Sequence, residues 1–235
     1  MKLKYAAKVD HVRETTLRGL ADLAPWQAQL AARGLTAVNR DGRAELMLSA
    51  TDAKFAGIRF RECSICALVR ENESGAEGWF MAHAFNSSRL FAWCERAFFA
   101  TPYYTGAVES NATPPAKIEA SADRGQFRAA MDASMRDREP SRRGHESWRG
   151  PIFLPSPPSK PTTIRKLFYT ALSGDTQAFP FMPDRDELAV TPTARWPIFA
   201  ALAESLFTGV EWLLRADASH AKSHTYEGAA QEVTW

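Results

Sequence analysis

The sequence predicts an α+β protein whose strands form a curled antiparallel sheet, open or closed into a barrel, with a few packed helices. Many short stretches alternate apolar and polar residues, whereas only three stretches place apolar residues at helical spacing. No repeat of 20 to 50 residues is visible. With 235 residues, 45% of them hydrophobic, the chain fits a single domain over residues 1–235 with a substantial core.

The composition limits the classes of partner and compartment. A total of 29 Lys and Arg against 27 Asp and Glu gives a net charge of +2, too balanced to indicate a nucleic-acid or membrane partner. No apolar run approaches a transmembrane helix, and residues 1–12 lack the apolar core of a signal peptide. Three cysteines fit a reducing compartment, so we expect a cytoplasmic protein.

Two elements are expected before the central part of the chain. Pro25 opens a short amphipathic helix that Gly34 ends. An Asp-Gly turn at residues 41–42 precedes a strand at residues 44–50. Residues 5–23 show mixed periodicity and predict no single element.

The most interpretable stretch is residues 61–69, which alternates as a strand should. One face carries Glu62, Ser64, Cys66 and Leu68, and the other carries Cys63, Ile65 and Val69. The two cysteines therefore point to opposite faces and cannot share one metal ion. We expect both to be packed core residues.

A hairpin and a helix follow this strand. A polar connection with two glycines leads into a second strand at residues 79–85. Ser87 can then cap a helix, whose apolar residues recur at helical spacing until Pro102 stops the pattern.

The second half of the chain predicts further short strands and one more helix. Pro197 starts that helix and Gly209 ends it, while the proline-rich residues 151–161 read as a loop at the end of the sheet or as a linker. The strand candidates are residues 106–112, 116–121, 127–135, 164–172 and 186–190.

One group near the C-terminus is spaced by two residues, so an extended chain would place it on one face. Its members are His220, Lys222, His224 and Tyr226. Such a face could bind an anion or a metal, or move protons near neutral pH. The alternative is a solvated edge strand.

The order of the central elements resembles the acetoacetate decarboxylase superfamily: a strand with a carboxylate, its hairpin partner, an apolar helix and a proline corner. The resemblance spans roughly residues 13–104 and implies a curled sheet around a cavity. Glu62 matches the glutamate that the family places on such a strand. Arg13 lies about where the family has an arginine that holds the substrate carboxylate, although it could equally be a solvated arginine. At the family's reactive lysine pair, this sequence has Tyr103 and Tyr104.

The resemblance implies an imine-forming lysine that this corner does not supply. A phenol cannot form the imine, but it can donate a hydrogen bond to a carbonyl or enolate oxygen, or act as a general acid. We therefore expect Glu62 to be the acid or base and Tyr103 or Tyr104 to polarise a carbonyl. Lys117 and Lys222 could supply an amine from other strands, although nothing in the sequence around them favours either.

Two further residues complete the expected binding set. Ser64 shares the face of Glu62, and His83 lies on the second strand, where a hydrogen-bonded core histidine is the alternative. The weakly polar wall around Glu62 should raise its pKa above that of an ordinary glutamate. Arg13, if it shared the site, would pull that pKa back down.

Two function classes follow. The first is a lyase, isomerase or cyclase acting on a carbonyl or keto-acid compound by non-covalent acid/base chemistry, with no bound cofactor or metal. A decarboxylase with a relocated lysine is a variant of it. The second is a non-catalytic protein that binds a carbonyl or carboxylate ligand in the same cavity. A homo-oligomer is compatible with either class.

Overall fold

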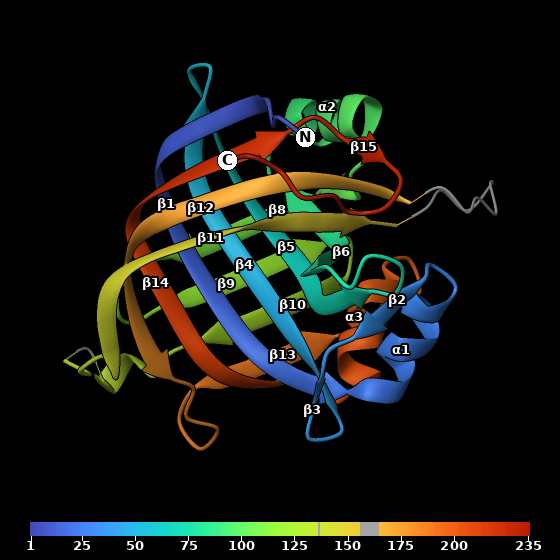
Figure 1. The fold of residues 1–235 in the computed structure, drawn as a ribbon. Coiled ribbons are helices and arrows are strands. Elements are labelled where there is room, and N and C mark those ends of the chain that lie inside the picture. The colour runs from blue at the N-terminus through green and yellow to red at the C-terminus, as the bar shows by residue number, and fades with distance from the viewer. Residues whose placement is uncertain (136, 156–164) are drawn as a thin grey trace.

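The structure, a computed structural model, describes residues 1–135, 137–155 and 165–235. Seven long strands pair side by side in the order β5-β4-β1-β14-β12-β11-β6, and β6 pairs back with β5, so the sheet closes into a ring. Figure 1 shows these strands wrapping around a common axis. They are β1 (Tyr5–Asp22), β4 (Arg43–Phe55), β5 (Ile58–Glu71), β6 (Glu77–Asn86), β11 (Arg142–Leu154), β12 (Lys166–Pro180) and β14 (Thr208–Ser223).

Four short strands extend this sheet, which is antiparallel except where β6 runs parallel to β11 and to β7. They are β2 (Leu35–Ala37), β3 (Asn39–Arg40), β7 (Tyr103–Thr105) and β15 (Tyr226–Glu227). A separate four-stranded sheet has the order β13-β10-β9-β8. Its strands are β8 (Ala107–Asn111), β9 (Lys117–Ala122), β10 (Gly125–Ala130) and β13 (Glu187–Thr191).

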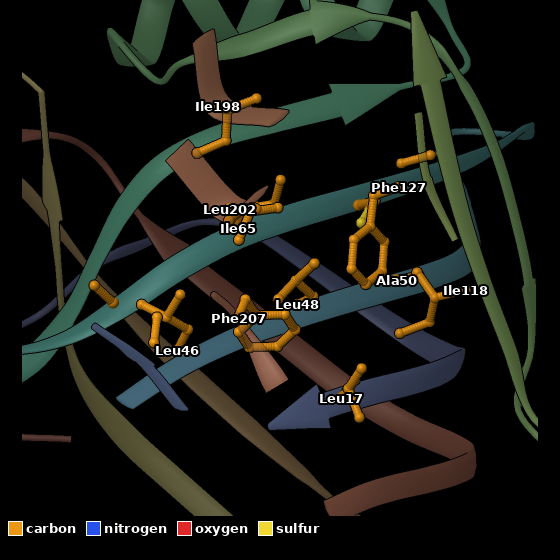
Figure 2. Close-up of a cluster of buried hydrophobic side chains, with 14 of the residues drawn as sticks. Leu17, Leu46, Leu48, Ala50, Ile65, Ile118, Phe127, Ile198, Leu202 and Phe207 are labelled. Atoms are coloured by element: carbon orange, nitrogen blue, oxygen red, sulfur yellow. The ribbon is translucent and has the colours of Figure 1, made fainter. Parts of the chain in front are cut away.

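The main core lies between the ring and the elements that cover it. Leu17 and Leu48 of the ring face Ile118 and Phe127 of the second sheet, with side chains of the third helix beside them (Figure 2). All four of these side chains are fully buried. The large apolar residues of one face of each strand are thereby removed from water, which is the main stabilising contribution of such a sheet.

The predicted α+β class and curled sheet are confirmed. The described residues contain three α-helices, α1 (Leu23–Ala31), α2 (Arg89–Phe99) and α3 (Pro197–Glu204). Ser88, not Ser87, caps α2, because its hydroxyl accepts a hydrogen bond from the Phe91 amide at 3.4 Å. None of the described helices is long and apolar enough to cross a lipid bilayer.

The first strand explains why residues 5–23 show no clear period. β1 is 18 residues long, and its pairing with β14 shifts register between Val9 and Val12 and again before Glu14. His11 at this irregularity has a positive φ of 59°. Each shift exchanges the inward and outward faces, so a single alternation cannot persist along the strand.

Two other expectations are changed or lie partly outside the described residues. The alternation predicted over residues 127–135 ends with β10 at Ala130, and a short 3-10 turn occupies Ala133–Met135. Of the predicted loop at 151–161, residues 151–154 belong to β11, and residues 156–161 lie outside the described part. β11 and β12 on either side pair with each other in one sheet, which favours one domain.

Candidate functional site

A cavity of about 350 Å³ is lined by side chains from every strand of the ring, from β7 and from α2. Its wall is mostly apolar. Phe55, Phe60, Met81, Phe91, Phe99, Ile152 and Phe168 are among the lining residues. The ionisable groups of the lining are few: Glu62, Cys94, Glu95, Tyr103, His220 and Lys222. A small ligand would therefore be held mainly by hydrophobic contact and oriented by a few polar groups.

Glu62 extends from β5 into this cavity, as the alternation of residues 61–69 predicts. Burial and the negative charge of Glu95 together raise its pKa to about 7, against the opposing effects of Lys222, His220 and Tyr103. Asn86, its cross-strand neighbour on β6, donates a hydrogen bond to Oε2 at 3.3 Å. A carboxyl with this pKa can give or accept a proton near neutral pH.

The two tyrosines of the proline corner point to opposite sides of β7. Tyr103 is buried, lines the cavity and shares a hydrogen bond with Glu62. Burial raises the pKa of Tyr103 well above its ordinary value, and the nearby carboxylates raise it further, so the phenol keeps its proton. Tyr104 stacks on His83 at 4.8 Å on the other side of the strand. Tyr103 alone of the pair can donate a hydrogen bond into the cavity.

Lys222 from β14 brings an amine into the cavity. Its Nζ pairs with Glu95 of α2 and lies 4.4 Å from the ring centre of Phe99 and 4.6 Å from that of Phe168. The ammonium is thereby held by one carboxylate and two aromatic faces. Tyr103 is also near, with its ring centre 6.0 Å from Nζ.

His220 joins the cavity to a second group of charges inside the ring. It lines the cavity, and its Nε2 lies 2.8 Å from Oε2 of Glu14. Arg215 donates to Oε1 of Glu14 at 2.9 Å and to Glu146 at 2.9 Å. Burial would raise the pKa of Glu14, but the hydrogen bond from His220 and the charges of His220 and Arg215 lower it to about 2. Glu14 is therefore a permanently ionised anchor.

Three predicted site residues lie outside the cavity lining. Arg13 is exposed on β1, with the buried Glu14 beside it. Ser64 shares the strand face of Glu62, but its hydroxyl reaches toward the Ser49 carbonyl at 3.5 Å. His83 is buried among Phe85, Tyr104 and Trp196, and burial lowers its pKa to about 4. Of the predicted site residues, Glu62 and Tyr103 line the cavity together. The lining does not include Arg13, Ser64, His83 or Tyr104.

Glu95 and Asn86 were not predicted from the sequence, which offered His220 and Lys222 only as part of a possible binding face, with Lys222 also as a possible amine. The two-residue spacing from His220 onward did signal a shared face, and His220 and Lys222 do share the cavity wall. Their strand is not a solvated edge, because β14 pairs with β1 on one side and β12 on the other. Glu95 gave no signal, since nothing in the sequence around it indicates that its side of the helix faces a cavity.

The two cysteines of β5 behave as expected. Cys63 packs into the main core and Cys66 into a separate cluster on the cavity side of the sheet. Burial raises the pKa of both thiols to about 12, which keeps them protonated. Across the described residues, no three His, Cys, Asp or Glu side chains converge in a way that could hold a metal ion.

The sequence matches no family model and no curated protein. Solved structures with the same fold do exist. An acetoacetate decarboxylase from Legionella pneumophila superposes with a TM-score of 0.64 at 14% identity, over 97% of this chain and 90% of that one. An acetoacetate decarboxylase-like enzyme from Sphingomonas wittichii RW1 gives 0.60 at 14% identity, over 97% and 95%. The enduracididine biosynthesis enzyme MppR, complexed with pyruvate, gives 0.60 at 12% identity, over 93% and 90%.

Proposed function

Because the chain has the acetoacetate decarboxylase-like fold, we propose that it is an enzyme that binds a small, largely apolar carbonyl compound in the ring cavity and transfers a proton next to the carbonyl. The observation that carries this proposal is Glu62, a carboxyl with a pKa of about 7 in a mostly apolar cavity, hydrogen-bonded to a tyrosine. Strongly shifted carboxyls in enclosed pockets are candidates for acid/base catalysis.

Glu62 is the proposed base. With a pKa of about 7, a large fraction of the group is ionised at neutral pH, yet its conjugate acid can still return a proton. In the first step the carboxylate removes a proton from the carbon beside the carbonyl, and the electron pair moves onto the carbonyl oxygen. In the second step the electron pair moves back from the oxygen, and the protonated carboxyl delivers a proton to the same carbon. This enolisation is common to isomerases and many lyases.

Tyr103 and Lys222 are the proposed partners of the enolate oxygen. Tyr103 stays protonated because its pKa lies well above the ordinary value, so it can donate a hydrogen bond to a developing anion. The ammonium of Lys222, already held by Glu95, adds positive charge on the same side of the cavity. Both donors are fixed before the ligand arrives, which avoids reorganisation during the reaction.

The ligand class follows from the lining and agrees with the solved neighbours. Acetoacetate and pyruvate, the compounds in the neighbours' names, both carry a ketone. The present cavity is mostly apolar, with aromatic side chains such as Phe60, Phe91 and Phe168. We therefore favour a ketone or aldehyde with an apolar substituent over a compact, highly charged keto acid.

The test is hydrogen exchange on candidate ligands. A panel of ketones, aldehydes and keto acids is first screened for thermal stabilisation, since any ligand that binds the folded state raises the melting temperature. Hits are then incubated in D2O, and deuterium incorporation beside the carbonyl is followed by NMR. Exchange that depends on Glu62 supports the enzyme. Ligands that bind tightly without exchange would instead support the non-catalytic binding protein.

A second candidate is imine chemistry at Lys222, favoured by its position. Among the described residues that line the cavity, Lys222 is the only amine, and it lies on the same side as Tyr103. Condensation of the neutral amine with a ketone would release water and form an imine. The amine is already engaged by the carboxylate of Glu95 and would have to leave it before attacking a ketone, so we rank this candidate second.

Borohydride trapping separates the two candidates. Reduction in the presence of a ligand hit should leave the protein mass unchanged if the chemistry is non-covalent. A stoichiometric mass increase that disappears in Lys222→Arg would establish the imine instead. Lys117, which pairs with Glu109 and Glu119 on the second sheet, serves as the control site in Lys117→Arg.

A further inference from the structure

The outer side of α2 and the tip of the β4–β5 hairpin form an exposed apolar surface. Phe98 is 67% exposed, and Leu90 and Trp93 are each 53% exposed on the helix. Phe55 and Ile58 are exposed at the hairpin tip. Half of the large apolar side chains that are exposed in the described residues therefore belong to these two segments. We refer to these five residues as the α2 face.

The two segments are neighbours in space. The ring of Phe55 lies 6.3 Å from that of Phe91, and the amide of Ser87 donates to the carbonyl of Arg61 at 2.8 Å. Figure 1 shows the hairpin tip and α2 at the same end of the ring. Exposed apolar side chains gathered at one end of a folded protein indicate an interaction site.

The helix is apolar on both sides, which a simple surface helix is not. Phe91 and Phe99 face inward and line the cavity. Leu90, Trp93 and Phe98 point away from it, and the rings of Trp93 and Phe98 meet edge to face at 5.5 Å. A single helix therefore separates the apolar cavity from the exposed apolar surface.

The charges on the two segments of the α2 face are mostly positive. Residues 54–61 and 87–100 contain Lys54, Arg59, Arg61, Arg89 and Arg96. Their only acidic residue is Glu95, which lines the cavity and pairs with Lys222. The nearby Asp52 is nearly buried between Arg59 and Arg61, so the rim keeps a positive excess.

We propose that the α2 face docks on a lipid bilayer with anionic headgroups, and that the cavity exchanges an apolar ligand with that bilayer. Aromatic and aliphatic side chains ringed by Lys and Arg suit the boundary between headgroups and acyl chains. Trp93 adds an aromatic ring with a polar edge, which suits this boundary. A second copy of the chain fits less well, because a symmetric contact would bring two positive rims together.

The test measures co-sedimentation of the full chain with vesicles of phosphatidylcholine alone or with phosphatidylserine added. We expect binding to the anionic vesicles, weak binding to the neutral ones, and release by high salt. Leu90→Ser should reduce the affinity by roughly tenfold, because its side chain would no longer enter the acyl region. Arg89→Gln should reduce binding to anionic vesicles by about fivefold and leave neutral vesicles unaffected.

Leu206→Ser is the matched control. Leu206 is 64% exposed and comes directly after α3, a helix that lies away from α2 in Figure 1, so the same chemical change there should leave vesicle binding unaltered. Circular dichroism confirms that each variant is folded. The proposal is overturned if the wild type ignores both vesicles or if the two serine variants lose binding equally. It is also overturned if light scattering shows a dimer that Leu90→Ser dissociates while vesicles are not bound.

Discussion

Glu14 and Glu62 occupy one row of the sheet, each pairing with Thr51 of the strand between them, yet their carboxyls behave in opposite ways. The pKa of Glu14 is lowered to about 2 and that of Glu62 is raised to about 7. Burial pushes both upward. At Glu14 the hydrogen bond from His220 and the charges of His220 and Arg215 reverse the effect of burial. At Glu62 the charge of Glu95 adds to burial, and the charges of Lys222 and His220 only partly oppose it. Counterions therefore decide which carboxyl is structural and which can exchange protons.

The comparison is tested most strongly by removing the base. Glu62→Gln should reduce deuterium exchange on a bound carbonyl ligand by about a thousandfold, because the amide cannot accept the proton. Ligand binding and the fold should survive. Glu14→Gln serves as the control, measured where it is still folded. Exchange at the wild-type rate in Glu62→Gln would remove Glu62 from the proposed chemistry.

Removing the other carboxyl should act on stability. Glu14→Gln leaves the buried Arg215 with Glu146 alone, and breaking such a buried pair costs about 3 kcal/mol of unfolding free energy at pH 7. Because the pKa is lowered in the folded state, this contribution is present above pH 4.5 and is lost as the pH falls toward 2. Urea unfolding at pH 7 and at acid pH measures both. A loss below about 1 kcal/mol at pH 7 would contradict the anchor role.

A third experiment measures what ionisation of Glu62 costs the fold. Its folded pKa is raised, so stability is lost as the pH rises from 4.5 to about 7 and stays lower above that range. Glu62→Gln should therefore be more stable than wild type by about 3 kcal/mol at pH 8, and close to wild type at pH 4. Equal differences at both pH values would show that the carboxyl is not desolvated.

The smallest effect distinguishes the two tyrosines. Tyr103→Phe should lower exchange by about tenfold, because one of the donors to the enolate oxygen is lost. Tyr104→Phe is the matched control on the other side of β7 and should leave exchange unchanged, since its ring contacts His83 and Trp196 instead of the cavity. A loss in Tyr104→Phe equal to that in Tyr103→Phe would indicate a general effect of the strand on the site.

The sequence predicted the local parts of this site well. Alternation along residues 61–69 was enough to place Glu62, and the desolvating wall correctly predicted the direction of its pKa shift. The sequence could not predict which of Tyr103 and Tyr104 faces the cavity, because a three-residue strand is too short to show an alternation of apolar and polar residues. Arg13 and Glu14 are adjacent, and the register shifts of β1 decide which of them turns inward.

Long-range pairing accounts for most of what the sequence did not predict. Lys222 lies near Glu95, 127 positions earlier, only because β14 completes the ring against β1 and β12. The net charge also gave no information about where charged residues lie on the surface. The total of +2 is small for the whole chain, but the two segments that carry the α2 face hold more basic than acidic residues. A net charge sums over the whole chain, so it cannot show a local excess of positive charge on one part of the surface.

The pairing of β1 with β14 also sets an order of events during synthesis. Tyr5 pairs with Ser223, so the ring cannot close until nearly the whole described chain has left the ribosome. Strands made early must wait with unpaired edges, and contacts of this sequence separation form slowly. His220 and Lys222 reach the cavity only in that final step. A nascent chain that is released before β14 is made would carry Glu62 and Tyr103 in an unfinished sheet, so the proposed activity would require β14.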